Sequence, residues 1–147
     1  MDLKILNVSN NALPEYKTKD SSGLDLRAYL PDGPLTLQPG QRRVIPTGLY
    51  MEIEPGYEGQ VRPRSGRAVK QGLTVINSPG TIDADYRGEV GVPLINLSTE
   101  PQTIENGDRI AQIVFSAYAK AEITEVGAIE ELSDTERGAG GFGHTGK

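Results

Sequence analysis

The sequence predicts an all-β fold, a compact β-sandwich or jelly roll with one short helix. Three observations lead to this prediction. The chain of 147 residues contains 18 glycines and 10 prolines, which divide it into short segments. Apolar and polar residues alternate with a period of two in several of these segments, as in strands buried on one face. No long stretch carries the spacing of an amphipathic helix.

The first half of the chain carries two alternating runs, each expected to form a strand. Their apolar positions are Leu24, Leu26, Ala28 and Leu30 in the first run, and Leu49, Met51 and Ile53 in the second. Turns are expected where proline and glycine interrupt the pattern, at Pro31, Pro34, Pro39-Gly40 and Pro55-Gly56. The two runs therefore belong to short strands that bury one face each.

A single helix is expected after these strands, over residues 65–71. Ser65 is a candidate N-cap, because its hydroxyl can accept a hydrogen bond from a free backbone N–H group. Gly72 can adopt the left-handed conformation that commonly ends a helix. A helix of this length makes about two turns.

Two further strands are expected in the second half of the chain. Val90, Val92 and Leu94 again alternate with other residues, and residues 110–115 are almost continuously apolar. A continuous apolar run indicates a strand in the interior of a sheet. Asn106-Gly107 marks the turn that precedes it.

The chain is expected to form one domain over residues 1–136, followed by a flexible tail. Its length suits one domain with a modest core, and no linker or internal repeat divides it. Residues 137–147 hold five glycines and one large apolar side chain, Phe142, too little to offset their ordering entropy. Arg137 and Thr145 add ligand-binding groups, so we expect this tail to close over the active site as a lid.

Charge and composition narrow the possible functions. The formal net charge of -5 argues against polymeric nucleic acid as a partner, because that binding requires a broad basic surface. The absence of cysteine excludes thiol chemistry and zinc-thiolate sites, and the one histidine, His144, stands near the end of the sequence. Any metal should be a hard, oxygen-liganded ion such as Mg²⁺. Without a signal segment or a stretch of membrane-spanning length, the expected location is cytoplasmic, with no membrane partner.

Two neighbouring segments point to phosphate chemistry. Residues 59–80 hold no acidic side chain and four basic ones, Arg62, Arg64, Arg67 and Lys70. Residues 81–89 follow with Asp83, Asp85 and Tyr86 in one tight loop. The basic group can hold a polyanion while a carboxylate beside it deprotonates water. The simpler alternative is a helix with solvated arginines and aspartates that only form turns.

Five short motifs, spread in order over nearly the whole chain, carry a family resemblance. They are Ser22-Gly23-Leu24-Asp25-Leu26, Pro63-Arg64-Ser65-Gly66, Gly80-Thr81-Ile82-Asp83-Ala84-Asp85-Tyr86-Arg87-Gly88-Glu89, Arg109-Ile110-Ala111-Gln112 and Arg137-Gly138-Ala139-Gly140-Gly141-Phe142-Gly143. In this order and spacing they are specific, and the chain resembles the trimeric deoxyuridine triphosphate nucleotidohydrolase (dUTPase) family. The resemblance implies a homotrimer that hydrolyses dUTP to dUMP and pyrophosphate with Mg²⁺. That reaction removes dUTP and supplies dUMP for thymidylate synthesis.

The resemblance also implies roles for single residues. Asp83 matches the catalytic carboxylate, which activates the water that attacks the α-phosphorus. Asp25 matches an aspartate that reaches the magnesium ion through water. The other matching positions bind substrate: Arg64, Ser65, Gly66 and Gln112 on the triphosphate, Asn77 on the hairpin that reads uracil, Tyr86 under the deoxyribose, and Arg137, Phe142, Gly143 and Thr145 in the tail.

In the family, each active site draws the first, second and fourth motifs from one subunit, the third from another and the fifth from the remaining one. This chain departs from the family pattern at Ser22, where alanine is common, and at His144, where a small hydroxyl residue is usual. The second departure changes a group near the γ-phosphate. We expect activity to survive it, with an altered affinity or pH dependence.

Three other interpretations remain open on the sequence. A dCTP deaminase would use the same jelly roll, but would act at the base and release ammonia. A non-catalytic nucleotide-binding module would keep Arg64, Ser65 and Gln112 and would not need Asp83. A purely structural jelly roll would need none of the five polar motifs.

Overall fold

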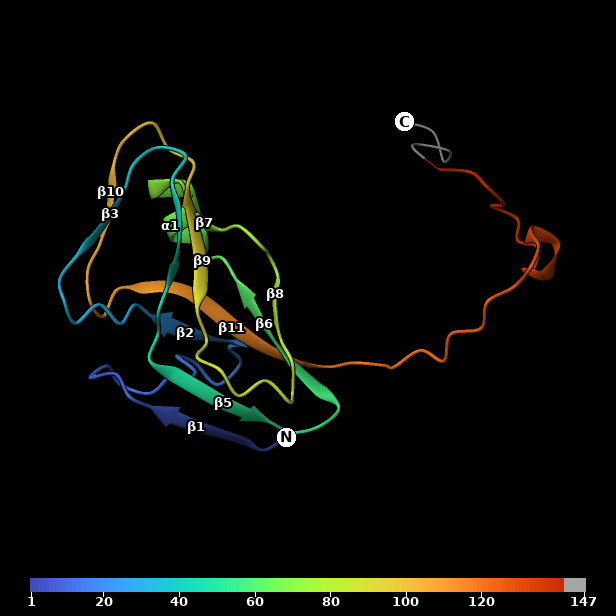
Figure 1. Ribbon diagram of the computed structural model, residues 1–147, viewed down its shortest axis with the longest axis horizontal. Coiled ribbons are helices and arrows are strands. Elements are labelled where there is room, and N and C mark those ends of the chain that lie inside the picture. Colours follow the sequence, from blue (N-terminus) through green and yellow to red (C-terminus); the bar gives the residue numbers. More distant parts are fainter. Residues whose placement is uncertain (142–147) are drawn as a thin grey trace.

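The computed structural model describes residues 1–141 and consists mainly of β-strands (Figure 1). In chain order the elements are β1 (Leu3–Asn7), β2 (Gly23–Arg27), β3 (Leu35–Leu37), β4 (Arg42–Ile45), β5 (Leu49–Ile53), β6 (Tyr57–Arg62), α1 (Ser65–Gln71), β7 (Leu73–Val75), β8 (Gly80–Ile82), β9 (Val92–Asn96), β10 (Gln102–Ile104), β11 (Arg109–Ala117) and a short 3-10 helix (Ile129–Glu131). The predicted all-β class with one short α-helix is confirmed.

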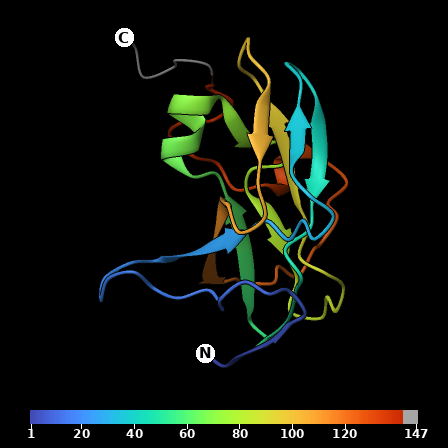
Figure 2. The ribbon, with the colours of Figure 1, turned by 90° about the vertical axis from the view of Figure 1, so that its left-hand side faces the viewer.

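The strands form a four-stranded sheet, a three-stranded sheet and two strand pairs. The four-stranded sheet has the order β2-β11-β6-β8, and the three-stranded sheet has the order β4-β9-β7. β1 pairs with β5 and β3 pairs with β10, and each of these pairings is antiparallel. Figures 1 and 2 both place α1 at the opposite end of the body from β1 and the N-terminus. β11 lies between β2 and β6, as its apolar sequence predicted.

A hydrophobic cluster joins all of the sheets. The residues that the alternation predicted to face inward are buried in β2, β5 and β9: Leu24, Leu26, Leu49, Met51, Ile53, Val92 and Leu94. β2 ends at Arg27, before the alternating run does. The next residue, Ala28, donates its N–H to the carbonyl of Asp108, in the turn before β11, at 2.8 Å. The core therefore follows the period-two pattern, whereas the strand ends follow hydrogen bonds to distant residues.

α1 covers the predicted residues, but its predicted N-cap is wrong. Arg64 stands at the N-cap position with an extended backbone (φ -94°, ψ 125°), and no side chain caps the helix. Ser65 is the first helical residue, one position too late to act as the cap. The C-terminal end agrees with the prediction, because Gly72 is left-handed (φ 64°) and its N–H donates to the Ala68 carbonyl at 3.2 Å. Within residues 1–141, no helix is long and apolar enough to cross a membrane.

Gly72 also belongs to one of two matching corners of the fold. In each corner an asparagine, a serine two positions later and a left-handed glycine meet: Asn7, Ser9 and Gly48 in one, Asn96, Ser98 and Gly72 in the other. The serine N–H donates to the asparagine side chain at 3.0 Å in the first corner and 2.9 Å in the second. Both glycines are needed where they stand, because an added Cβ atom would meet the serine at 2.7 Å.

Replacing Gly72 with alanine is expected to lower the free energy of unfolding by about 3 kcal/mol, since strain from the left-handed backbone adds to the contact with Ser98. Gly40 is a matched control, because it also has a positive φ (76°) but no atom within 4 Å of an added Cβ. Gly40→Ala should lower the free energy of unfolding by only about 1 kcal/mol, because alanine is strained in the left-handed conformation. Urea denaturation measures both values, and equal losses would contradict the packing argument.

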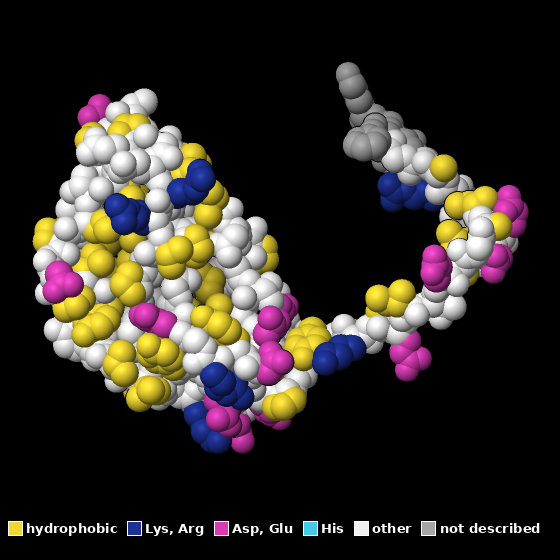
Figure 3. All heavy atoms as spheres, viewed as in Figure 1, with side chains coloured by type: hydrophobic (Ala, Val, Ile, Leu, Met, Phe, Trp, Pro, Cys, Tyr) yellow, Lys and Arg dark blue, Asp and Glu magenta, His cyan; other side chains and the backbone are white. Residues whose placement is uncertain are grey.

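After β11 the chain leaves the body as a long extended arm, residues 118–141 (Figures 1 and 3). The Tyr118 N–H donates to the Gly56 carbonyl at 3.1 Å where the arm begins. Farther along, the hydrogen bonds of the arm are local, such as that from Arg137 Nε to the Gly140 carbonyl at 2.8 Å. The arm nevertheless carries large apolar side chains that are exposed, including Ile123 (93%) and Ile129 (74%).

Candidate active site

The first, second and fourth sequence motifs meet at one end of the four-stranded sheet. Asp25 on β2 pairs in register with Gln112 on β11, and Gln112 pairs with Arg62 on β6. The segment that joins β6 to α1 begins beside this row and carries Arg64, and Ser65 and Gly66 are the first two residues of α1. We call these residues, with Asp25, Gln112 and Arg109, the anion cluster.

Asp25 organises the anion cluster. Its Oδ1 lies 2.7 Å from Arg64 Nε, and its Oδ2 lies 3.1 Å from an Arg109 terminal nitrogen. The Asp25 side chain is only 17% exposed, so solvent screens these pairs less than it screens surface pairs. Gln112 Nε2 donates to the Pro63 carbonyl at 2.9 Å and ties β11 to the same segment. The Arg64 guanidinium is therefore held in one orientation beside the start of α1.

The start of α1 presents backbone donors to solvent. The first N–H groups of any helix lack partners within the helix, and Ser65 and Gly66 are both exposed. An added Cβ atom on Gly66 would meet nothing within 4 Å, so the space above it is open. A ligand with several acceptor oxygens can approach this backbone closely and also reach the Arg64 guanidinium.

Arg67 does not belong to this open surface, which corrects the view of residues 59–80 as one free basic group. A terminal nitrogen of Arg67 lies 2.9 Å from Asp108 Oδ2, and Arg67 Nε donates to the Arg109 carbonyl at 2.7 Å. The Arg67 side chain is only 13% exposed, so its charge is neutralised at the base of α1. α1 buries none of its residues fully, and Arg67 therefore helps to attach the helix to the turn before β11.

Asn77, Asp83 and Tyr86 meet in a second place, a pocket of about 230 Å³ beside β8. Gly80 contributes to the narrow wall of this pocket, because an added Cβ atom there would lie 3.0 Å from Asn77 Nδ2. Asp83 is exposed and also lines a larger hollow of about 900 Å³, together with Asp85. The carboxylate thus stands where a pocket for a small flat group opens onto a wider charged surface.

The loop after β8 is shaped by its own hydrogen bonds. The Tyr86 N–H donates to the Asp83 carbonyl at 3.1 Å and closes a turn. A terminal nitrogen of Arg87 donates to the carbonyls of Ala84 (2.7 Å) and Tyr86 (2.9 Å). On the rim of the larger hollow, a hydrogen bond from Lys4 holds the pKa of Glu52 below its usual value. Lys4 and Arg87 are therefore occupied by other groups of the protein itself.

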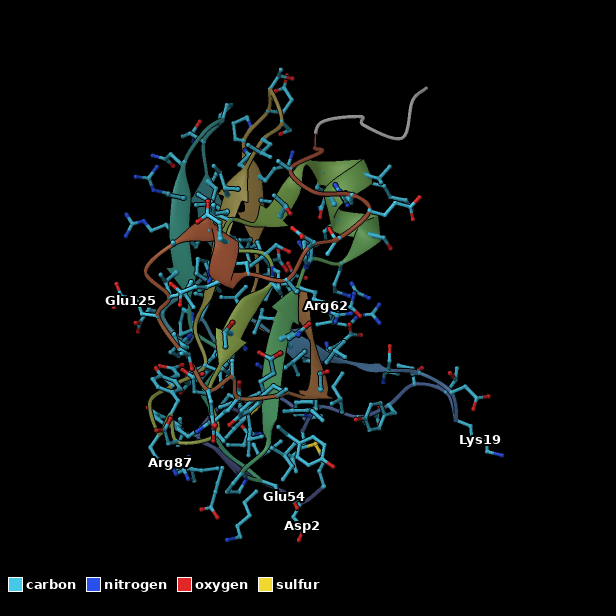
Figure 4. The ribbon with its side chains drawn as sticks, turned by 90° about the vertical axis from the view of Figure 1, so that its right-hand side faces the viewer. Asp2, Lys19, Glu54, Arg62, Arg87 and Glu125 are labelled. Carbon is cyan, nitrogen blue, oxygen red and sulfur yellow. The ribbon has the colours of Figure 1, made fainter. Side chains whose placement is uncertain are left out.

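Within one chain, Asp83 and Arg64 of the anion cluster lie apart. Ile82, the last residue of β8, pairs with Gly59 on β6. Arg64 stands five residues farther along the chain than Gly59, and five extended residues span roughly 17 Å. Asp83 continues in the opposite direction, because β6 and β8 are antiparallel. Figure 4 shows the same separation between Arg62, beside the helix, and Arg87, in the loop after Asp83.

The structure places Arg137 on the arm, where Figure 1 shows the chain well away from both clusters. Phe142, Gly143, Thr145 and the divergent His144 lie outside the described residues. Among residues 1–141, no three acidic, histidine or cysteine side chains gather as a metal site. Within the described residues, Asp25 is the acidic member of the anion cluster, where it pairs with Arg64 and Arg109.

Two residues that reasoning from the sequence left without a role belong to these clusters. Arg109 shares the Asp25 carboxylate with Arg64, and Glu89 lines the pocket that holds Tyr86. Both residues lie inside the five sequence motifs, and this position was the signal in the sequence that could have pointed to them. Neither role could be read from the chain, because the partner of Arg109 is 84 residues away.

The sequence of this chain is similar to those of known proteins over nearly its whole length. The dUTPase family model matches residues 9–146. A deoxyuridine 5'-triphosphate nucleotidohydrolase from Finegoldia magna is 54% identical over 146 residues, which cover 99% of this chain and 99% of the relative. One from Cytophaga hutchinsonii is 57% identical over 145 residues, which cover 99% of this chain and 92% of the relative.

A solved structure agrees with these relatives. A mutant dUTPase of Staphylococcus bacteriophage 80alpha, determined with dUpNHpp, superposes with a TM-score of 0.87 at 27% sequence identity. The superposition covers 99% of both chains. Because the family model and the relatives span nearly the whole sequence, this chain belongs to the dUTPase family.

Proposed function

We propose that this protein hydrolyses dUTP to dUMP and pyrophosphate, through attack of water on the α-phosphorus. The observation that carries the proposal is that the chain has two complementary sites. One is the anion cluster, with free backbone donors, and the other is a small pocket with a carboxylate at its mouth. A nucleoside triphosphate has the matching two ends, a chain of phosphates and a flat base on a sugar. The phage relative with dUpNHpp supports the same class of ligand.

The pocket suits a pyrimidine and its deoxyribose. Its volume of about 230 Å³ lies below the range of roughly 300–1,000 Å³ that is common for drug-sized ligands. In the proposal, Asn77 and the neighbouring backbone read the edge of uracil, and the tight wall at Gly80 rejects a 5-methyl group. The Tyr86 ring lies under the sugar and excludes a 2′-hydroxyl. Phe142, in the tail, closes over the base.

The anion cluster binds the triphosphate in this proposal. The backbone N–H groups of Ser65 and Gly66 donate to phosphate oxygens, with Arg64 and Gln112 at their side. Asp25 keeps Arg64 in place, since the pair is preformed at 2.7 Å. Preformed donors lose little freedom when the ligand binds, so positioning and electrostatic stabilisation supply much of the catalysis. Arg137, Gly143 and Thr145 complete the phosphate contacts from the tail.

Asp83 acts as the general base. It is exposed at the mouth of the pocket, where a water molecule can lie between its carboxylate and a bound α-phosphate. The water transfers a proton to Asp83 as its oxygen bonds to phosphorus, and the bond from phosphorus to the bridging oxygen breaks to release pyrophosphate. Closure of the tail would exclude other water from the reaction.

Mg²⁺ belongs to the proposal as an ion held mainly by substrate phosphates and water. Asp25 fits the role of an indirect ligand, because a carboxylate has about four acceptor sites and its two arginine partners leave capacity for water. Such mixed coordination is usual for this ion, which loses its waters reluctantly. When bound, it would neutralise charge on the phosphates and make the α-phosphorus more electrophilic.

The proposal includes a homotrimer. Asp83 and Arg64 of one chain stand too far apart to serve the same phosphate group, so the two clusters of one active site would come from different subunits. The arm offers a means of assembly, because its exposed apolar residues Ile123 and Ile129 have no use in an isolated chain. The tail would then reach a neighbouring site. Because the proposed substrate belongs to the nucleotide pool of the cytoplasm, we also place the protein there.

The test is pyrophosphate release with Mg²⁺, measured side by side on dUTP, dTTP, dCTP and UTP. We expect kcat/KM for dUTP to exceed each of the others by at least ~100-fold, since the pocket wall and the tyrosine reject an added methyl or hydroxyl group. Ammonia release from dCTP would favour a deaminase. Tight binding of dUTP without turnover would favour a non-catalytic module.

A further inference from the structure

We propose that Glu89 is a positioning residue that sets the preference for deoxyribose over ribose, acting through the hydroxyl of Tyr86. The inference rests on the proposed function, in which Tyr86 lies under the sugar. Glu89 lines the same pocket as Tyr86 and Asp83. Its side chain points away from solvent toward the body of the protein, where it contacts backbone and not another charge.

The Glu89 carboxylate fastens the loop after β8 to the turn between β4 and β5. Its Oε1 accepts hydrogen bonds from the backbone N–H groups of Thr47 at 3.1 Å and Gly48 at 2.7 Å. Hydrogen bonds to an ionised acceptor are roughly twice as strong as neutral ones. Glu89 also forms an isolated β-bridge with Tyr50. These contacts hold the Glu89 backbone at one place on the body.

The turn that receives Glu89 is tightly packed. Gly48 is left-handed (φ 68°), and an added Cβ atom would lie 2.7 Å from Ser9. Thr47 is buried, and its hydroxyl donates to the Val90 carbonyl at 2.6 Å. The Val90 N–H donates to the Leu49 carbonyl at 2.8 Å. Glu89 is thus attached to a turn that is packed against the core.

Glu89 in turn fixes the phenol end of Tyr86. The Tyr86 hydroxyl donates to the Glu89 carbonyl at 3.0 Å. Gly88 makes this possible, because an added Cβ atom there would lie 2.3 Å from the Tyr86 hydroxyl oxygen. The ring therefore folds back across Gly88 while one side remains exposed to the pocket. Its orientation depends on a chain of contacts that runs from the Thr47–Gly48 backbone through Glu89 to the phenol.

This chain of contacts bears on sugar selection more than on phosphate binding. Rejection of a 2′-hydroxyl requires a ring that cannot move aside, because one added hydroxyl group is discriminated only weakly by a yielding apolar surface. The phosphate donors stand in the anion cluster, around Asp25 and Arg64, which Glu89 does not contact. Loss of the Glu89 carboxylate should therefore relax the preference between dUTP and UTP while phosphate binding persists.

The experiment compares Glu89→Ala, Glu89→Gln and Tyr86→Phe with the unmodified full chain. Hydrolysis gives kcat and KM for dUTP and UTP, and calorimetry gives the affinities for dUpNHpp and its ribose counterpart. We expect Glu89→Ala to reduce the deoxyribose preference about tenfold, and Glu89→Gln, which keeps an acceptor oxygen, to stay within about threefold of the unmodified protein. Tyr86→Phe should act in the same direction. The double variant Glu89→Ala/Tyr86→Phe should lose little more, because both changes break one connection.

Thr47→Val is the matched control. This change removes the hydrogen bond from the Thr47 hydroxyl to the Val90 carbonyl, in the same turn. It keeps the Thr47 backbone N–H, which donates to the Glu89 carboxylate. We expect it to lower the melting temperature without changing the deoxyribose preference. An unchanged preference in Glu89→Ala, or an equal loss in Thr47→Val, would overturn the inference. If Glu89→Ala does not fold, an unchanged preference in Tyr86→Phe overturns it. Failure of the unmodified chain to release pyrophosphate would refute the proposed function instead, and the binding preferences would still decide the role of Glu89.

Discussion

Replacing Asp83 with asparagine is expected to lower kcat for dUTP hydrolysis at least ~100-fold, while nucleotide binding persists. Asparagine has nearly the same shape as aspartate and can still form hydrogen bonds, but it cannot take a proton from water. Asp83 is exposed and has no ion-pair partner within the described residues, so its replacement should leave the fold unchanged. Pyrophosphate release gives kcat, and titration with dUpNHpp gives the affinity.

Asp85→Asn is the matched control for this prediction. Asp85 is exposed in the same loop, and its replacement by asparagine removes the same negative charge. Asp85 lines the larger hollow but not the small pocket. Its replacement should change kcat by less than about threefold, as expected for a charge away from the reacting atoms. A near-normal rate in Asp83→Asn would remove Asp83 from the role of base. Equal losses in both variants would point to the charge of the loop and not to proton transfer.

A chain that ends at Glu136 is expected to fold and assemble normally but to lose about 100-fold or more in kcat/KM, because the lid that orders the substrate is gone. The described part of the removed segment makes only local hydrogen bonds, between Gly138 and Thr135 and, in both directions, between Arg137 and Gly140. Among the described residues, Ile113 is the last buried residue of the core along the chain. Thermal unfolding and sedimentation should therefore match the full-length protein.

Removal of Gly146 and Lys147 alone is the control for the shortened chain. It leaves Arg137, Phe142, Gly143 and Thr145 in the sequence, and its kcat/KM should stay within about twofold of the full-length value. Full activity in the chain that ends at Glu136 would refute the proposed lid. A loss of assembly in that chain would show that the removed residues hold subunits together instead of covering substrate.

The fold was largely predictable because its signals are local. Alternation of side chains follows directly from the pleat of a strand, so Leu24, Leu26 and Met51 could be assigned to the core without knowledge of their partners. The left-handed Gly72 could likewise be expected at a helix end. The Ser65 cap was predicted from local chemistry as well, but Arg64, whose side chain pairs with Asp25, occupies the N-cap position, and Ser65 is the first helical residue.

The site was only partly predictable because charges act through partners that are distant in the sequence. Arg67 and Arg64 look alike within residues 59–80, yet Arg67 is neutralised by Asp108 at the foot of the helix, while Arg64 is held beside open backbone donors. Glu89 stood in a recognised motif without a role until its two backbone partners were seen, one of them 41 positions away. The sequence motifs indicated which kind of chemistry to expect. The contacts in the folded chain show which residues of those motifs are free to bind a ligand and which are held by the protein.

Properties of neighbouring residues were enough to establish the strands, the short helix and the order of motifs that places the chain in its family. Which charges are free, which hydroxyl holds the tyrosine, and how far Asp83 lies from the anion cluster depended on the folded chain. The physical reason is that patterning is governed by the backbone repeat over a few residues, whereas electrostatic pairing and pocket shape arise between segments that only antiparallel pairing brings together.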